Sequence, residues 1–271
     1  MEIYKPFKKI KSKISERLKA DQFLSNSEKK KLRRLKRYEP AKIIFLKKEL
    51  RIVDSLTFLH SYSEIFINKI YKFATVQEAP VIIDCGANIG LATIYFQLNF
   101  PGARIVAFEP DPDIYEVLNQ NIAAFAFKDV VCKNEAVSNR DGLLSFWPEG
   151  GHSGMLAPPT DELKSVMVKA IRLRDFLRQY PRITFLKIDI EGEEINVIPD
   201  IADELKKVDY LFLEYHAFIG KEQQLDRLLQ YITRAGLRYY IKEAADKPLP
   251  FIYRELFLNM EMLVNIFCYR N

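Results

Sequence analysis

Two apolar segments of this chain carry charged side chains at alternating positions. In the first, Lys187, Asp189 and Glu191 share one face of a predicted strand. In the second, Glu214 and His216 share one face in the same way. A central parallel strand is normally apolar on both faces, and buried charges are costly unless they are paired or functional. If the two strands are neighbours, these side chains converge at one rim of a sheet, where an active site is expected.

These residue types suit the removal of a proton from a hydroxyl group. His216 is the predicted general base, because its unperturbed pKa of about 6.5 can be tuned by a carboxylate such as Glu214. Asp189 is the second candidate, either to take the proton or to position the acceptor. Lys187 would neutralise Asp189 or stabilise a developing alkoxide. A purely structural role for His216 stays open.

A metal-assisted reaction is the less favoured alternative. Asp189 and Glu191 have the spacing of two oxygen ligands, and a divalent metal bound by them could make a hydroxyl more acidic. Glu191 and Glu194 also lie at the turn into a predicted helix, where carboxylates stabilise the N-terminus equally well. We assign no metal ligand from the sequence.

A glycine loop follows an apolar strand earlier in the chain. The strand ends in Asp84, and Gly86, Asn88 and Gly90 precede a helical pattern. A dinucleotide-binding loop would need glycine at the positions of Asn88 and Leu91, so a nicotinamide cofactor is disfavoured. The spacing instead is that of loops that bind S-adenosylmethionine, whose cationic methionine end suits Asp84. An ordinary turn with a helix cap at Asn88 is the alternative.

A second acidic strand end supports a nucleoside cofactor. The segment 104–109 ends in Glu109, whose carboxylate can accept hydrogen bonds from both ribose hydroxyls. Residues after the third predicted strand would lie against the adenine, whereas Asp111 more readily begins a helix. The predicted cofactor-binding residues are Asp84, Gly86, Ala87, Asn88, Gly90, Glu109, Pro110, Asp111, Glu135, Ala136 and Asp189.

With these motifs, residues 60–240 resemble the FkbM family of S-adenosylmethionine-dependent methyltransferases. The matching segments are Ile-Asp-Cys-Gly-Ala-Asn-Ile-Gly (83–90), Ala-Phe-Glu-Pro-Asp-Pro (107–112), Leu-x-x-Asn-Ile (118–122), Ala-Val-Ser (136–138), Leu-Lys-Ile-Asp-Ile-Glu-Gly-x-Glu (186–194) and Glu-Tyr-His (214–216). The resemblance implies a Rossmann-like fold and methyl transfer mostly to hydroxyl oxygens of sugars or polyketides. It does not extend to residues 1–55.

The elements that must position these residues alternate between strand and helix. Strands are predicted near 81–84, 104–109, 129–134, 183–189 and 209–215, and helices near 89–99, 112–125, 193–206 and 221–235. This alternation predicts a parallel sheet with helices on both faces. A pair near 237–242 and 262–269 adds an antiparallel C-terminal hairpin. The expected fold is therefore α/β, a Rossmann-like class I methyltransferase with a mostly parallel seven-stranded sheet.

Three further segments lie outside this alternation. Strands at 142–147 and 166–173 are expected to flank an exposed loop rich in glycine and proline. A helix over 61–73 would cover the cofactor cleft, with Tyr62, Ser63 and Glu64 as candidate lid residues. Residues 41–58 favour a β-hairpin.

The positive charge of the chain is concentrated at its beginning. Residues 1–40 hold 14 of the 41 Lys and Arg residues but only 5 of the 36 Asp and Glu residues, so the remainder is mildly acidic. We therefore divide the chain into a basic helical extension (1–55), with a possible hairpin, and a methyltransferase domain (56–271). The extension has the pattern of an amphipathic helix that would contact an anionic membrane or pack on the body. Nucleic acid is a weaker partner, because basic charge alone is unspecific.

Compartment and substrate are inferred less directly. Three cysteines in apolar surroundings, with neither a signal peptide nor an apolar run of membrane-spanning length, favour a cytoplasmic protein at the inner membrane face or free of it. We expect O-methylation of a sugar hydroxyl in a surface glycan or glycolipid precursor. The alternatives are a polyketide-like acceptor and a non-catalytic docking module that binds the cofactor.

Overall fold

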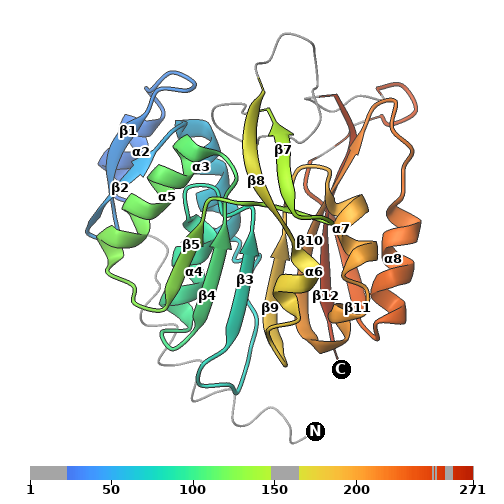
Figure 1. Ribbon diagram of the computed structural model, residues 1–271. Helices are drawn as coiled ribbons and strands as arrows, with labels where there is room; N and C mark the ends of the chain where they lie inside the picture. Colours follow the sequence, from blue (N-terminus) through green and yellow to red (C-terminus); the bar gives the residue numbers. More distant parts are fainter. Residues whose placement is uncertain (1–22, 148–164, 246, 248, 254–258, 271) are drawn as a thin grey trace, which may run out of the picture.

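A seven-stranded sheet forms the centre of the computed structural model, which describes residues 23–147, 165–245, 247, 249–253 and 259–270 (Figure 1). The strands follow the order β11–β12–β10–β9–β3–β4–β5. Their bounds are β3 Val81–Cys85, β4 Arg104–Phe108, β5 Val130–Lys133, β9 Ile183–Ile188, β10 Val208–Phe218, β11 Arg238–Glu243 and β12 Met260–Tyr269. The core pairs are parallel, and β12 runs antiparallel to both β10 and β11. The predicted fold class is confirmed.

Each face of the sheet is buried against its own layer. Ile82, Phe185 and Phe212 belong to a cluster with residues of α3 (Ser55–Tyr62), α4 (Leu91–Asn99) and α5 (Pro112–Phe125). Ile83 and Leu186 belong to a second cluster with α6 (Leu173–Leu177), α7 (Glu194–Asp200) and α8 (Leu225–Arg234). Because side chains alternate along a strand, positions 187, 189, 214 and 216 fall on the α3 side of the sheet.

The helix before the first core strand differs from its prediction. Asp54 caps α3 by accepting a hydrogen bond from the backbone N–H of Thr57 at 2.9 Å, so the helix begins well before position 61. It continues as a π-helical turn, Ser63–Ile67, and ends there. Tyr62 is buried against Phe45 and Phe58 and belongs to the core, so it is not a lid residue.

The other helices follow their predicted ranges more closely. The helix expected over 193–206 is divided into α7 and a 3-10 turn, Glu204–Lys207. Pro199 lies near the end of α7 and has no N–H to donate, which accounts for the early end.

A second, three-stranded sheet lies beside the first. It consists of β6 (Ala136–Ser138), β7 (Gly142–Phe146) and β8 (Val166–Arg172), in the order β6–β8–β7. The strands predicted at 142–147 and 166–173 are thus confirmed, while most of the loop between them, 148–164, lies outside the described residues.

The described part of the N-terminal segment packs on the body. In α2 (Asn26–Leu32), Leu32 is fully buried while its lysines stay at the surface. The predicted hairpin is formed by β1 (Ala41–Phe45) and β2 (Lys48–Ile52), and Asn121 of α5 hydrogen-bonds both backbone groups of Arg51, at 2.8 and 3.0 Å. The helix predicted from the first apolar residues, Ile3 to Leu18, lies outside the described residues.

The composition raised two questions, the state of the cysteines and the presence of a membrane-spanning helix. The three cysteines are free thiols, and burial raises the pKa of Cys132 to about 11 and that of Cys268 to about 12. Among the described helices, none is long and apolar enough to cross a membrane.

Candidate active site

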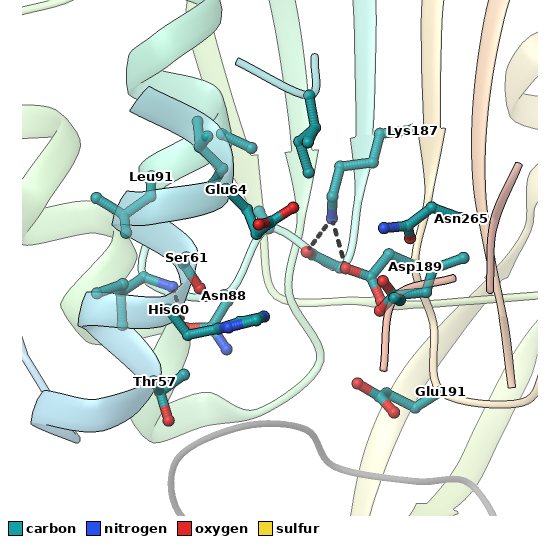
Figure 2. Close-up of a pocket in the computed structure, with 18 of the residues that line it drawn as sticks. Thr57, His60, Ser61, Glu64, Asn88, Leu91, Lys187, Asp189, Glu191 and Asn265 are labelled. Atoms are coloured by element: carbon teal, nitrogen blue, oxygen red, sulfur yellow. Dashed lines mark hydrogen bonds and ion pairs between the residues drawn. The ribbon is translucent and has the colours of Figure 1, made fainter. Parts of the chain in front are cut away.

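A cavity of about 520 Å³ opens between α3, the glycine loop and the ends of β9, β10 and β12 (Figure 2). All four predicted catalytic residues line it, which are Lys187, Asp189, Glu214 and His216. The register explains this, since Phe212 pairs with Lys187 in the parallel β9–β10 ladder and the charged positions follow at intervals of two. Of the predicted cofactor-binding residues, the cavity also includes Gly86, Ala87 and Asn88.

The glycine loop is fixed to the two strands that flank β3. The backbone N–H groups of Gly86 and Ala87 both donate to the carbonyl of Phe108, at 3.0 and 2.8 Å. Gly86 has φ +81°, and a Cβ at this position would lie 1.9 Å from the carbonyl oxygen of Asp189. Only glycine therefore permits the loop to approach the end of β9 so closely.

A buried lysine ties this loop to two carboxylates. The ammonium of Lys187 donates to the carbonyl of Gly86 at 2.7 Å and lies 3.3 Å from both Asp84 Oδ1 and Asp189 Oδ2. Burial lowers the pKa of Lys187, but the charges of Asp189 and Asp84 outweigh it and hold that pKa well above its usual value. Lys187 is thus charged and neutralises Asp189, as one of its two predicted roles requires.

Asp84 lies behind this lysine. It is fully buried, accepts a hydrogen bond from Thr93 Oγ1 at 2.7 Å and does not itself line the cavity. Its influence on a ligand therefore passes through Lys187 and differs from the direct contact expected from the sequence.

Glu109 lies directly beneath the loop. Its two carboxylate oxygens accept hydrogen bonds from the backbone N–H groups of Asn88 and Asp111, at 2.8 and 3.0 Å. Burial raises the pKa of Glu109 to about 8 despite these bonds. A carboxylate so buried gains from further donors such as ribose hydroxyls.

Four of the remaining predicted cofactor residues lie away from the cavity, because they follow β4 and β5 whereas the cavity opens toward α3 and β12. Gly90 instead lies in the glycine loop between Ile89 and Leu91, which line the cavity, without lining it itself. Asp111 caps α5 by accepting from the N–H of Asp113 at 2.9 Å, as its helix-starting role predicts. Glu135 forms ion pairs with Lys169 and Lys133. The other two are Pro110, whose carbonyl accepts from Asn134, and Ala136, which is buried in β6.

His216 is held between carboxylates. Its Nε2 lies 3.1 Å from Glu191 and its Nδ1 lies 3.3 Å from Glu194. Burial lowers the pKa of His216, but the charges of Glu191 and Glu194 prevail and raise it well above its usual value. An imidazolium has no lone pair with which to accept a proton, and both ring nitrogens already face carboxylates, so the role of general base stays a prediction.

The turn after β9 is organised by a second buried acid. Glu194 accepts hydrogen bonds from the N–H groups of Ile190 and Gly192, at 3.0 and 2.9 Å. The capping role considered for Glu194 is therefore present, together with its contact to His216. Glu191 adopts φ +55° in this turn.

Glu214 lines the cavity beside Asp189. Burial raises the pKa of Glu214 well above its usual value, and the charges of Asp189 and Glu191 add to this. Asp189, Glu214 and His216 offer donor atoms that all lie within 4.8 Å of one another. The sequence suggested Asp189 and Glu191 as an alternative pair of metal ligands. The cluster in the structure contains Glu214 in place of Glu191, whose carboxylate faces His216.

Sequence reasoning missed two sets of cavity residues. From α3 come Thr57, His60 and Ser61, which the sequence did not place in a helix together. From β12 comes Asn265, which pairs with Glu214 across the antiparallel ladder and faces the cavity beside Asp189 (Figure 2). An amide within the apolar stretch 262–268 was the available signal.

Comparison with known proteins agrees with this geometry. The model of the methyltransferase FkbM domain matches residues 84–239. Methyltransferase sdnD of Sordaria araneosa is 32% identical over 204 residues, which cover 62% of this chain and 79% of the relative. The 31-O-demethyl-FK506 methyltransferase FkbM of Streptomyces tacrolimicus is 27% identical, covering 62% and 78%. The hexuronic acid methyltransferase AglP of Haloferax volcanii is 28% identical, covering 52% and 58%.

Among solved structures, TYW2 of M. jannaschii in complex with AdoMet covers 88% of this chain and 89% of its own, with 14% identity and a TM-score of 0.44. This likeness is too distant to bear on function. The domain match spans more than half of the chain and includes the glycine loop, Glu109, and the charged ends of β9 and β10. The chain therefore belongs to the FkbM family of methyltransferases, and S-adenosylmethionine is its methyl donor.

Proposed function

We propose that this protein methylates a hydroxyl oxygen of a sugar, in a surface glycan or glycolipid precursor. The observation that carries the proposal is the position of Asp189 and Glu214, two carboxylates in the wall of a cavity that the glycine loop also lines. Carboxylates at this place can accept the proton that a hydroxyl loses when its oxygen is alkylated. The relative that methylates 31-O-demethyl-FK506 supports the choice of oxygen, and the hexuronic acid methyltransferase AglP supports the choice of a sugar.

The residues present fit the cofactor. When bound, S-adenosylmethionine supplies a methyl group activated by a sulfonium. Glu109 would accept hydrogen bonds from its ribose, because each oxygen of this buried carboxylate receives one backbone N–H and can accept a further donor. The acidic wall of the cavity would favour the cationic end of the molecule. Gly86 and Asn88 would present the loop backbone to it.

We assign proton removal to Asp189. Its side chain is about one quarter exposed at the cavity, and the ammonium of Lys187 lies 3.3 Å from its Oδ2. As the acceptor oxygen forms its bond to the methyl carbon, its proton passes to this carboxylate. His216 is protonated and orients Glu191 and Glu214 around the acceptor.

The opposite wall of the cavity suits a polyhydroxylated acceptor. Thr57, His60, Ser61 and Glu64 line it from α3 and the turn that follows (Figure 2). Side chains of these types exchange hydrogen bonds with sugar hydroxyls. The cavity volume of about 520 Å³ is within the range of small-molecule sites.

The basic segment 1–40 would bring the enzyme to its acceptor. Its excess of Lys and Arg favours an anionic membrane surface, where lipid-linked sugars are held. Sedimentation of the full chain with anionic but not neutral vesicles is the expected result. Equal recovery with both would exclude this part of the proposal.

The test begins with calorimetry of S-adenosylmethionine binding to the purified chain. Methyl transfer is then assayed with nucleotide-linked sugars, lipid-linked glycans and a polyketide macrolide. We expect turnover with the sugars, and a loss of about 100-fold or more in kcat for Asp189→Asn with cofactor affinity retained. Asp175→Asn, which changes an exposed carboxylate on α6, is the matched control. Full turnover by Asp189→Asn, or turnover with the macrolide alone, would contradict the proposal.

A further inference from the structure

The cavity wall holds more negative charge than the protein itself compensates. Five carboxylates gather behind and along it, which are Asp84, Asp189, Glu191, Glu194 and Glu214. Within the described part of the chain, two cations face them, Lys187 and His216. Carboxylates crowded in a buried site repel one another when ionised, so a cluster with more acids than cations favours the binding of a cation.

A buried amide in the same wall has an unused acceptor. Asn265 is 4% exposed, and within the described part of the chain its Oδ1 has no hydrogen-bond partner. It pairs with Glu214 across the β10–β12 ladder, so the two side chains lie on one face of the sheet. Its side chain is directed into the cavity next to Asp189 (Figure 2). A buried acceptor without a donor costs free energy, which a bound ligand would recover.

We propose that Asp189, Glu214 and Asn265 bind one divalent cation, Mg²⁺ or Mn²⁺, at the end of β9, β10 and β12. Two carboxylates and one amide oxygen are the hard ligands that these ions prefer. The donor atoms of Asp189 and Glu214 lie within 4.8 Å of each other, close enough to be drawn onto one ion. His216 shares that limit, but both of its ring nitrogens face carboxylates and so it borders the site without being a ligand.

The proposed ion would also narrow the class of acceptor. An ion bound by three protein oxygens keeps further positions for an acceptor that offers two oxygens, such as adjacent hydroxyls or a hydroxyl beside a carboxylate. The bound hydroxyl would lose its proton more readily, to the carboxylate oxygen of Asp189 that does not bind the ion. This role rests on the proposed function, whereas binding of the ion does not.

The test uses the full chain freed of metal and saturated with S-adenosylhomocysteine. Free Mn²⁺ is followed by electron paramagnetic resonance, and cofactor affinity is measured separately by calorimetry. We expect one saturable Mn²⁺ site per chain. Glu214→Gln and Asn265→Leu should each weaken Mn²⁺ binding by about tenfold or more while cofactor affinity stays within about threefold. Asn265→Asp, which keeps an oxygen ligand, should retain the site.

The control is Glu243→Gln, an exposed acid on β11, which should leave Mn²⁺ binding unchanged. Thermal unfolding of every variant shows that it is folded. Cofactor binding without saturable Mn²⁺ binding would overturn the cation site, as would unaltered Mn²⁺ affinity in folded Glu214→Gln. Mn²⁺ binding without cofactor binding would instead overturn the proposed function and leave the cation site standing.

Discussion

The two sides of the cavity satisfy their polar groups in different ways. On the loop side, Lys187 bridges Asp84, Asp189 and the carbonyl of Gly86, so its charge is compensated within the protein. On the acid side, Glu214 lies beside other carboxylates, and the amide oxygen of Asn265 has no hydrogen-bond partner among the described residues.

This difference separates positioning from binding. A buried polar network whose members are all paired is rigid and specifies one conformation. Groups left crowded or unpaired in a cavity are maintained at a cost in stability, which indicates a ligand or a reaction. The loop side should therefore respond to mutation mainly through stability, and the acid side mainly through binding and turnover.

The largest effect is expected at the centre of the loop side. Lys187→Met leaves the buried Asp84 and the partly exposed Asp189 without their shared counter-charge, and breaking such a pair costs about 3–5 kcal/mol in the free energy of unfolding. Urea denaturation measures it. Lys206→Met, which removes an exposed pair with Asp203, should leave the free energy of unfolding nearly unchanged. Equal losses in the two variants would contradict the distinction between the two sides.

A slightly smaller loss is expected from Gly86→Ala. The new Cβ would collide with the carbonyl of Asp189, and the alanine backbone would have to stay in the left-handed region. The combined cost is about 2–4 kcal/mol. Cofactor affinity should fall as well, because the loop must move away from β9. Gly220→Ala is the matched control, with φ +74° but nothing within 4 Å, and should cost about 1 kcal/mol. A normal thermal midpoint for Gly86→Ala would show that the loop is not held as described.

Much of this site was predictable from alternation along single strands. Because side chains alternate with a period of two, Lys187 and Asp189 were expected on one face at the end of β9. Glu214 and His216 were expected together on one face of β10, before any register was known. That the two strands are neighbours was a condition of this prediction, and the ladder of β9 with β10 meets it and brings the groups together.

Partners from distant segments were not predictable in this way. Asn265 reaches Glu214 only because β12 inserts between β10 and β11, and no local pattern fixes that register. The charge of His216 likewise depends on Glu191 and Glu194, which a turn with positive φ directs back onto the strand. The sequence therefore identifies which residue types face the cavity, whereas the protonation of His216 depends on contacts between segments that are distant in the chain.

A pH-dependent effect of intermediate size is expected from Glu109. Its pKa is raised to about 8 in the folded protein, so between pH 4.5 and 8 the folded state holds a proton that the unfolded state has lost. Stability of the cofactor-free protein therefore falls as pH rises through this range, by up to about 1.4 kcal/mol per pH unit from this group. Glu109→Gln should show a flatter profile in urea denaturation. Parallel profiles would contradict the assignment.

The smallest change concerns His216, on the acid side. Since its folded pKa is raised, His216 contributes stability that is complete below its unfolded pKa of about 6.5 and is lost as pH rises toward the folded value. Its imidazole resonances should therefore show a protonated ring at pH 7.5 by NMR. Glu191→Gln removes one of the two charges that sustain this state and should shift the titration to lower pH, whereas Glu243→Gln should not. A wild-type ring that titrates near pH 6.5 would restore His216 as a candidate base, because the acid side would then hold a neutral imidazole beside the acceptor.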